Sequence, residues 1–153
     1  MSSELVHMLV TDVMTPYLIT IDKYANLAEA YEIMLKNKIR RIPVTENDRL
    51  VGIVTMKDIL DAKPSDVRHS LNTEELNELL STIIVDQVMK HDPIRVYQTD
   101  TLGHAAEIML DKKIGGLPVI DANKNLVGLI TESDIFRTIV KKWRDDNIIN
   151  AGI

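Results

Sequence analysis

The feature that most constrains the fold is an internal duplication of the chain. Val13-Met14 recurs as Val88-Met89, and Pro43-Val44 recurs as Pro118-Val119, in both cases 75 residues later. The same spacing links four apolar pairs: Leu27 with Leu102, Ala30 with Ala105, Ile33 with Ile108, and Met34 with Met109. Beyond the prolines the spacing is 76 residues and links Gly52 with Gly128, Thr55 with Thr131, Asp58 with Asp134, and Ile59 with Ile135. Because one copy is too small to cover its own apolar elements, we expect the two to pack together with pseudo-two-fold symmetry.

Both copies have the same order of predicted elements, β-α-β-β-α. Short apolar strands are expected at 18–21 and 94–96, and amphipathic helices follow at 27–36 and 102–112. The next two strands are expected at 42–45 and 50–54 in the first copy, and at 117–120 and 126–130 in the second. Thr55 and Thr131 then begin a second helix. We therefore predict a mixed α/β fold in which two pseudo-symmetric repeats pack face to face through their small sheets.

The duplication also sets the expected boundaries. A first repeat covers 8–62, a helical connector 63–84, a second repeat 85–140, and a C-terminal tail 141–153 that begins as a continuation of the last helix. The connector carries Asn72 three residues before Glu75, a pattern typical of a helix N-terminus. The extra residue of the second copy is placed in the polar turn 121–125.

Composition excludes several classes of function. A net charge of −5 argues against non-specific nucleic-acid binding, which needs a basic face. The chain has no cysteine, which excludes disulfides, thiolate zinc sites and a cysteine nucleophile, and is consistent with a reducing, cytoplasmic compartment. We expect no signal peptide and no membrane helix, because no apolar run reaches the required ~20 residues. The four histidines lack metal-ligand spacing and no phosphate-loop motif is present, so no catalytic residue and no metal site are predicted.

The sharpest local signal is the pattern Thr-x-x-Asp at the start of each second helix, Thr55 to Asp58 and Thr131 to Asp134. Taken alone, this pattern favours a helix cap, which is worth about 0.5–2 kcal/mol. It is also compatible with a ligand site, because free N–H groups at a helix N-terminus attract phosphate. An aspartate can in addition accept two hydrogen bonds from the diol of a ribose.

A second signal precedes each repeated proline. The first copy has Arg40-Arg41 at this position and the second has Gly115-Gly116. The arginines are either solvated loop residues or phosphate ligands, since guanidinium groups match phosphate geometry. The glycines either form a turn that needs positive φ or allow a ligand to approach bare backbone.

Taken together, these motifs resemble the cystathionine-beta-synthase (CBS) domain family, here as a tandem pair called a Bateman module. The resemblance rests on Val-Met near each repeat start, the apolar-Pro-Val strand, and Gly-apolar-apolar-Thr-x-x-Asp, all of which occur twice and in the same order. The connector also resembles that of bacterial stand-alone pairs of the acetoin-utilisation type. The resemblance implies a regulatory module that binds an adenosine-containing ligand (AMP, ADP or ATP, with S-adenosylmethionine or NAD as alternatives) in the cleft between the repeats.

The resemblance further implies two sites that combine residues of both repeats. Site one consists of Thr131, Asp134, Thr15, Pro16, Thr20, Arg40, Arg41, Ile42 and Pro43. Site two consists of Thr55, Asp58, Asp92, Pro93, Gly115, Gly116, Leu117 and Pro118. Site one is the better candidate for a phosphorylated ligand, because it holds both arginines. In site two no arginine stands at the matching positions and the charge of Asp92 would repel phosphate.

Three functions remain open from the sequence. The first is a nucleotide sensor that acts on a regulated protein. The second is a ligand-free dimerisation or docking module, supported by apolar side chains on the second helices and by the homodimers that the resemblance implies. The third, an enzyme, ranks last because no nucleophile–base set is visible in the sequence.

Overall fold

A computed structural model of the chain describes residues 3–16, 19–64, 71–150 and 152. The chain divides into two compact units, and each is described here by itself. Unit 2 is formed by residues 19–93, and unit 1 combines residues 1–18 with residues 94–153. The two units are therefore not the two repeats as they follow each other in the sequence, because the leading segment of each repeat belongs to the unit of the other.

Unit 2 holds a four-stranded sheet of order β1-β2-β3-β4. Strand β1 runs parallel to β2, and the pairs β2–β3 and β3–β4 are antiparallel. Its strands are β1 (Ile21–Asp22), β2 (Arg41–Glu46), β3 (Arg49–Thr55) and β4 (Lys90–His91). Its helices are α3 (Leu27–Asn37), α4 (Met56–Asp61), α5 (Thr73–Ser81) and α6 (Val85–Val88).

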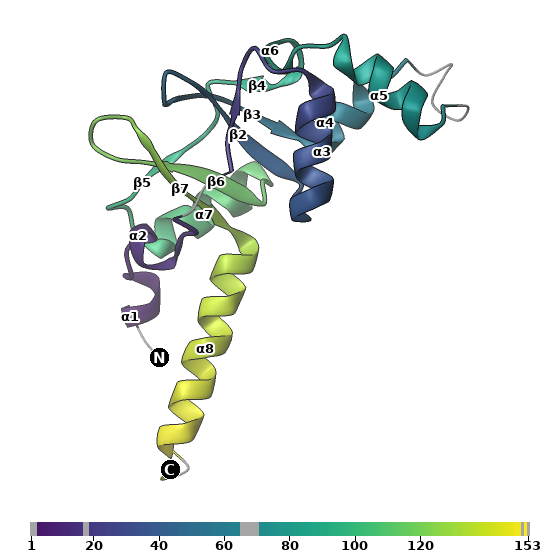
Figure 1. Cartoon of the computed structure of the whole chain (residues 1–153). Helices are drawn as coiled ribbons and strands as arrows, with labels where there is room; N and C mark the ends of the chain where they lie inside the picture. The colour runs from purple at the N-terminus through teal and green to yellow at the C-terminus, as the bar shows by residue number, and fades with distance from the viewer. Residues whose placement is uncertain (1–2, 17–18, 65–70, 151, 153) are drawn as a thin grey trace. The chain divides into compact units, whose positions relative to one another are not determined.

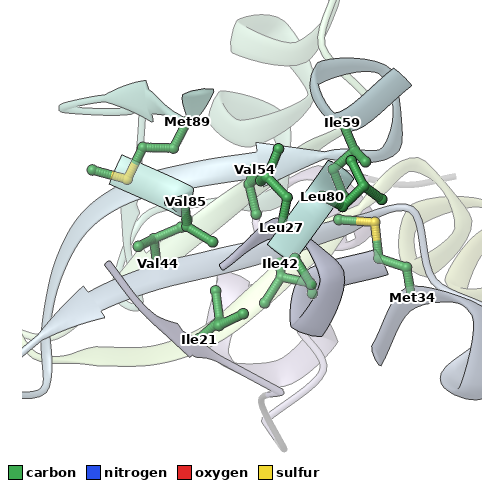
Figure 2. Packing of buried hydrophobic residues seen from close by; sticks show 11 residues of the cluster. Ile21, Leu27, Met34, Ile42, Val44, Val54, Ile59, Leu80, Val85 and Met89 are labelled. Carbon is green, nitrogen blue, oxygen red and sulfur yellow. The ribbon is translucent and has the colours of Figure 1, made fainter. Parts of the chain in front are cut away.

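The core of unit 2 is built from one face of this sheet and from all four helices. Figure 2 shows Ile42, Val44 and Val54 of the sheet gathered with side chains from the helices. The helical residues are Leu27, Met34, Ile59, Leu80 and Val85, and each is at most 1% exposed. Burying a side chain of this size is worth about 1.5–3 kcal/mol, so this cluster is the main stabilising feature of unit 2.

Unit 1 holds a three-stranded sheet of order β5-β6-β7. Its strands are β5 (Val96–Tyr97), β6 (Gly116–Ile120) and β7 (Leu126–Thr131). Its helices are α1 (Ser3–Val6), α2 (Val10–Val13), α7 (Leu102–Lys112) and α8 (Glu132–Asn150). The core contains Val10 of α2 together with Val96, Leu102, Ala105, Met109, Leu117, Val119 and Ile130. Helix α8 is a single continuous helix, so the predicted C-terminal tail is helical up to Asn150 (Figure 1).

The leading segment of each repeat, which belongs to the unit of the other repeat, makes equivalent hydrogen bonds in the two units. In unit 1 the amide of Leu102 donates to the carbonyl of Met8 at 2.7 Å, and in unit 2 the amide of Leu27 donates to the carbonyl of Ile83 at 2.8 Å. Both partners shift by the same 75 residues between the units. The two short helices α2 and α6 therefore occupy equivalent places, and the duplication holds in three dimensions.

Most of the expected elements are confirmed. Both repeats have the order β-α-β-β-α, and α7 has the predicted bounds. The first strand of each repeat is shorter and begins later than predicted, because only two residues pair with the neighbouring strand in β1 and in β5. Residue 18, where the first of them was expected to begin, lies outside the described residues. Packing of the repeats face to face stays a prediction.

The extra residue of the second copy lies where it was expected. Asn47 and Asp48, both with positive φ, form the tight turn between β2 and β3. Between β6 and β7 the turn is longer and is held by the Asp121 carboxylate, which accepts from the amides of Asn123 and Asn125 at 2.8 and 2.9 Å. The side chain of Asp121 thus adds to the backbone bond from its own amide to the carbonyl of Asn125, which measures 3.0 Å.

Candidate functional site

The Thr-x-x-Asp segment of unit 1 forms a helix cap at the junction of β7 and α8. The amide of Thr131 donates to Asp134 Oδ2 at 2.9 Å, and the amide of Asp134 donates back to Thr131 Oγ1 at 3.3 Å. These two bonds are the two halves of a capping box. The cap interpretation is therefore correct for this segment, and Thr55 and Asp58 of unit 2 form the same box at 2.9 and 3.1 Å.

Asp134 has more hydrogen-bond partners than a cap requires. Its side chain is buried, with 6% of its surface exposed. The hydroxyl of Thr131 also donates to Oδ2 at 3.1 Å. On the other oxygen, Oδ1, the hydroxyl of Thr15 donates at 3.2 Å and Arg137 Nη1 donates at 3.1 Å. The carboxylate is thus a buried anion held by four donors, one of them a guanidinium.

Thr15 is brought to this place by backbone pairing with β7. Its amide donates to the carbonyl of Leu129 at 2.9 Å, and the amide of Leu129 donates to the carbonyl of Thr15 at 3.1 Å. This closed pair fixes the hydroxyl beside Asp134. Pro16, which follows, is exposed. The sequence analysis placed Thr15, Thr131 and Asp134 in one site, and the structure brings these three together.

The glycine pair lies directly beside the start of α8. Gly116 is the register partner of Thr131, and the carbonyl of Gly115 accepts from the amide of Glu132 at 3.0 Å. Neither glycine has positive φ, so the turn interpretation is wrong for this pair; Lys113, two residues earlier, has a φ of 55°. The other interpretation, that a ligand approaches bare backbone here, stays a prediction, and Gly116 itself is buried. Leu117 and Pro118 are buried in β6.

In unit 2 the two predicted arginines lie beside the equivalent cap. Arg41 is the register partner of Thr55, and the carbonyl of Arg40 accepts from the amide of Met56 at 2.8 Å. Ile42 and Pro43 follow as buried residues of β2. The arginines are therefore neighbours of Thr55 within their own unit, and their predicted grouping with Thr131 stays a prediction.

The other residues predicted to bind ligand from unit 2 flank its short strands. Thr20 is exposed just before β1. Asp92 and Pro93 follow β4, and the amide of Asp92 donates to the carbonyl of Val51 at 3.2 Å. Asp92 has a φ of 46°, a backbone conformation that an aspartate tolerates better than most residues.

The two capped aspartates are not equivalent. Asp58 is half-buried, and the position that Arg137 holds in unit 1 is taken by Asp61 in unit 2. Asp61 is bound by Lys57 at 2.7 Å, and this hydrogen bond raises the pKa of Lys57, with a smaller contribution from the charge of Asp58. The place of Thr15 is taken by Lys90, which pairs with Ile53 as Thr15 pairs with Leu129.

Sequence analysis missed Arg137. A signal for it exists, because residues three apart on a helix are neighbours on its surface, and Arg137 follows Asp134 by three. The ion pair between them measures 3.1 Å. Its charge has no counterpart in the other repeat, where Asp61 stands at the equivalent position, so the repeated motifs do not include it.

The structure bears on two further possibilities, a metal site and a membrane-spanning helix. Within residues 3–16, 19–64, 71–150 and 152, no group of three or more histidine, cysteine, aspartate or glutamate side chains is arranged to hold a metal ion. Among the same residues, every helix is too short or too polar to cross a membrane.

Comparison with known proteins identifies one family, whose model matches both repeats of the chain. The family model described as "CBS domain" matches residues 10–65 and 85–141. Protein MJ1225 of Methanocaldococcus jannaschii is 36% identical over 112 residues, which are 72% of this chain and 40% of that protein. Its crystal structure gives a TM-score of 0.73 and covers 87% of this chain and 48% of the chain compared. The present chain therefore spans less than half the length of this relative.

Two further structures are similar over most of both chains. CBSX2 of Arabidopsis thaliana, solved in complex with AMP, is 28% identical with a TM-score of 0.75, and covers 88% of this chain and 97% of its own. The CBS domain pair of protein MJ0100 was solved with 5′-methylthioadenosine and S-adenosyl-L-methionine. It is 26% identical with a TM-score of 0.71, and covers 88% of this chain and 98% of its own.

Proposed function

The chain belongs to the CBS domain family, and from this premise we propose that it is a regulatory module that binds an adenosine-containing ligand at the cap of unit 1. The observation that carries the proposal is the buried carboxylate of Asp134, which lies at the N-terminus of α8. A buried anion with several donors is costly to maintain for packing alone, and the cap at Asp58 forms with its carboxylate only half-buried.

Two features of the cap fit the parts of an adenosine ligand. The Asp134 carboxylate can accept from a ribose diol. The N-terminus of α8 carries partial positive charge, which attracts phosphate. CBSX2 with AMP and the MJ0100 pair with two adenosine derivatives support this class of ligand.

The choice among ligands follows from whether phosphate contributes to binding. AMP, ADP and ATP are favoured if Arg40 and Arg41 take part, as the sequence analysis predicts for site one. S-adenosylmethionine is the main alternative, because it carries the ribose and base but no phosphate. The equivalent cap of unit 2, formed by Thr55 and Asp58, is proposed as a weaker site.

A thermal-shift series tests the proposal. Adenosine, AMP, ADP, ATP, S-adenosylmethionine and NAD are compared with guanosine monophosphate as the control. A ligand at 100 times its Kd stabilises the folded state by about 2.7 kcal/mol, which is readily seen as a rise in Tm. We expect Asp134→Ala to fold but to lose this rise, and Asp58→Ala to retain it. An unchanged response in Asp134→Ala contradicts the site, and no response of the wild type to any ligand contradicts the function.

One observation favours a second role, association with another copy of the chain. The outer face of α8 exposes Phe136, Ile139, Val140 and Trp143, which are 42–63% exposed and follow the spacing of one helical stripe. Light scattering on the wild type and on Trp143→Glu tests this. A dimer that dissociates in the variant supports it, and a monomer at all concentrations contradicts it.

Regulation of a partner protein, a cytoplasmic location and the lack of catalytic activity are parts of the same proposal. Ligand binding is expected to bias the conformation that a partner recognises, because a ligand stabilises the state it binds best. The absence of cysteine is in keeping with a reducing compartment.

A further inference from the structure

The hydrogen bonds of Asp134 raise a question about how a ligand could use this residue. Two donors bind each carboxylate oxygen: the amide and hydroxyl of Thr131 on Oδ2, and Thr15 with Arg137 on Oδ1. An ionised carboxylate has about four acceptor positions, so these donors fill its capacity. If the proposed function is correct, a ribose diol can bind Asp134 only by displacing a donor that is already present.

Arg137 is the donor that can leave at least cost. Thr131 is held as the cap of α8, and Thr15 is fixed by its two backbone bonds to Leu129. The side chain of Arg137, by contrast, is 73% exposed and reaches Asp134 from the surface. Water can replace Asp134 as the partner of this exposed guanidinium, and the buried carboxylate keeps its three other donors. Release of the guanidinium therefore frees one acceptor position on Oδ1, enough for one hydroxyl of the ribose diol, without disturbing the backbone, while Thr15 keeps its bond to the same oxygen.

We propose that Arg137 is a displaceable counter-ion that neutralises Asp134 in the ligand-free protein and turns to the phosphate of a bound nucleotide. The inference rests on the proposed function. In an adenine nucleotide the phosphate is attached to the same ribose whose diol would bind Asp134, so one long side chain can reach both groups. A guanidinium is well suited to phosphate, because it presents several N–H donors in one plane.

The arrangement is specific to unit 1. Three residues after Asp58 the chain has Asp61, whose negative charge would repel phosphate and which is already bound by Lys57. Arg137 thus distinguishes the two caps. We therefore expect selectivity for phosphorylated ligands to reside at the cap that contains Asp134. It also provides a phosphate ligand from the same unit as the ribose ligand.

The test is a calorimetric titration of the full chain with AMP and with adenosine. The variant is Arg137→Gln, and the control is Arg144→Gln, which removes the same charge from an exposed position on the same helix. We expect the wild type and the control to bind AMP more tightly than adenosine. In Arg137→Gln the affinity for AMP should fall about tenfold or more, as for a lost charge-assisted hydrogen bond, while adenosine binds equally or more tightly. Arg137→Lys should recover part of the preference.

The other outcomes separate this inference from the function on which it rests. Equal weakening of AMP and adenosine in Arg137→Gln, or no change in either, overturns the role of Arg137 and leaves the nucleotide site in place. Failure of the wild type to bind either compound overturns the proposed function, and the role of Arg137 with it. Circular dichroism of each variant checks that the fold is retained.

Discussion

The side chain of Met89 lies against Gly52, in the space where a larger residue would place its Cβ. Met14 lies against Gly128 in the same way. The repeated Val-Met and the repeated Gly are therefore the two sides of one contact, made once in each unit. Because the methionine and the glycine of each contact come from different repeats, this contact joins each exchanged leading segment to the sheet it packs on.

The first prediction concerns these glycines. A Cβ at position 52 would stand 2.9 Å from the carbonyl oxygen of Lys90 as well as against Met89, so the backbone of β4 would have to move. At position 128 the close neighbours are all side-chain atoms of Met14, which is flexible. We expect Gly52→Ala to cost about 1–3 kcal/mol of unfolding free energy and Gly128→Ala clearly less, as measured by urea denaturation. Equal costs would contradict the backbone clash.

Much of the fold was predictable because the duplication presents the hydrophobic pattern of each helix and strand twice. The helix at Leu102–Lys112 and the strands around Pro43 and Pro118 follow from periodicity that appears twice. The exchange of leading segments was not predictable in this way. A repeat in the sequence shows which residues are equivalent, but the partner of each segment is set by long-range hydrogen bonds such as that of Leu102 with Met8.

The site was predictable where local chemistry decides it. Thr131 and Asp134 follow a capping pattern, and the structure shows both halves of it. The burial of Asp134 and its bond to Thr15 depend on a backbone pairing across more than a hundred residues, which no local pattern shows. Arg137 lacks a repeated counterpart, so the motifs shared by the two copies do not include it.

The second prediction concerns the segment expected to be a mere connector. Leu80 of α5 has no exposed surface and packs with Leu27, Met34 and Ile59 in the core of unit 2 (Figure 2). We expect Leu80→Ala to cost about 2–5 kcal/mol of unfolding free energy, because it leaves a cavity in a close-packed core. The matched control is Leu110→Ala on the surface of α7, where the side chain is 79% exposed and the change should stay within about 0.5 kcal/mol. Similar values for both variants would show that α5 is not part of this core.

The third prediction concerns pH. Lys23 binds Glu46 at 2.8 Å, and this hydrogen bond raises the pKa of Lys23 above 10.5 in the folded protein. A raised pKa in the folded state means that the stabilisation is fully present below pH 10.5 and is lost as the pH rises through the folded-state pKa. The difference in unfolding free energy between the wild type and Lys23→Met should therefore shrink in strongly alkaline solution. Lys36→Met, at an exposed position of α3, serves as the control and should show no such change. A difference that is constant with pH would rule out the ion pair as its source.

The last prediction compares the two capped aspartates by the same substitution. In Asp58→Asn the remaining oxygen can still accept the amide of Thr55, so the loss should stay below about 1 kcal/mol. In Asp134→Asn the amide nitrogen cannot accept from either of the donors on the oxygen it replaces, and Arg137 loses its counter-ion. Because the residue is buried, we expect a cost of about 1–3 kcal/mol in urea denaturation. Adding Arg137→Gln to Asp134→Asn should then cost little more, since the two changes remove one shared interaction. Fully additive losses would show that Arg137 stabilises α8 independently of Asp134.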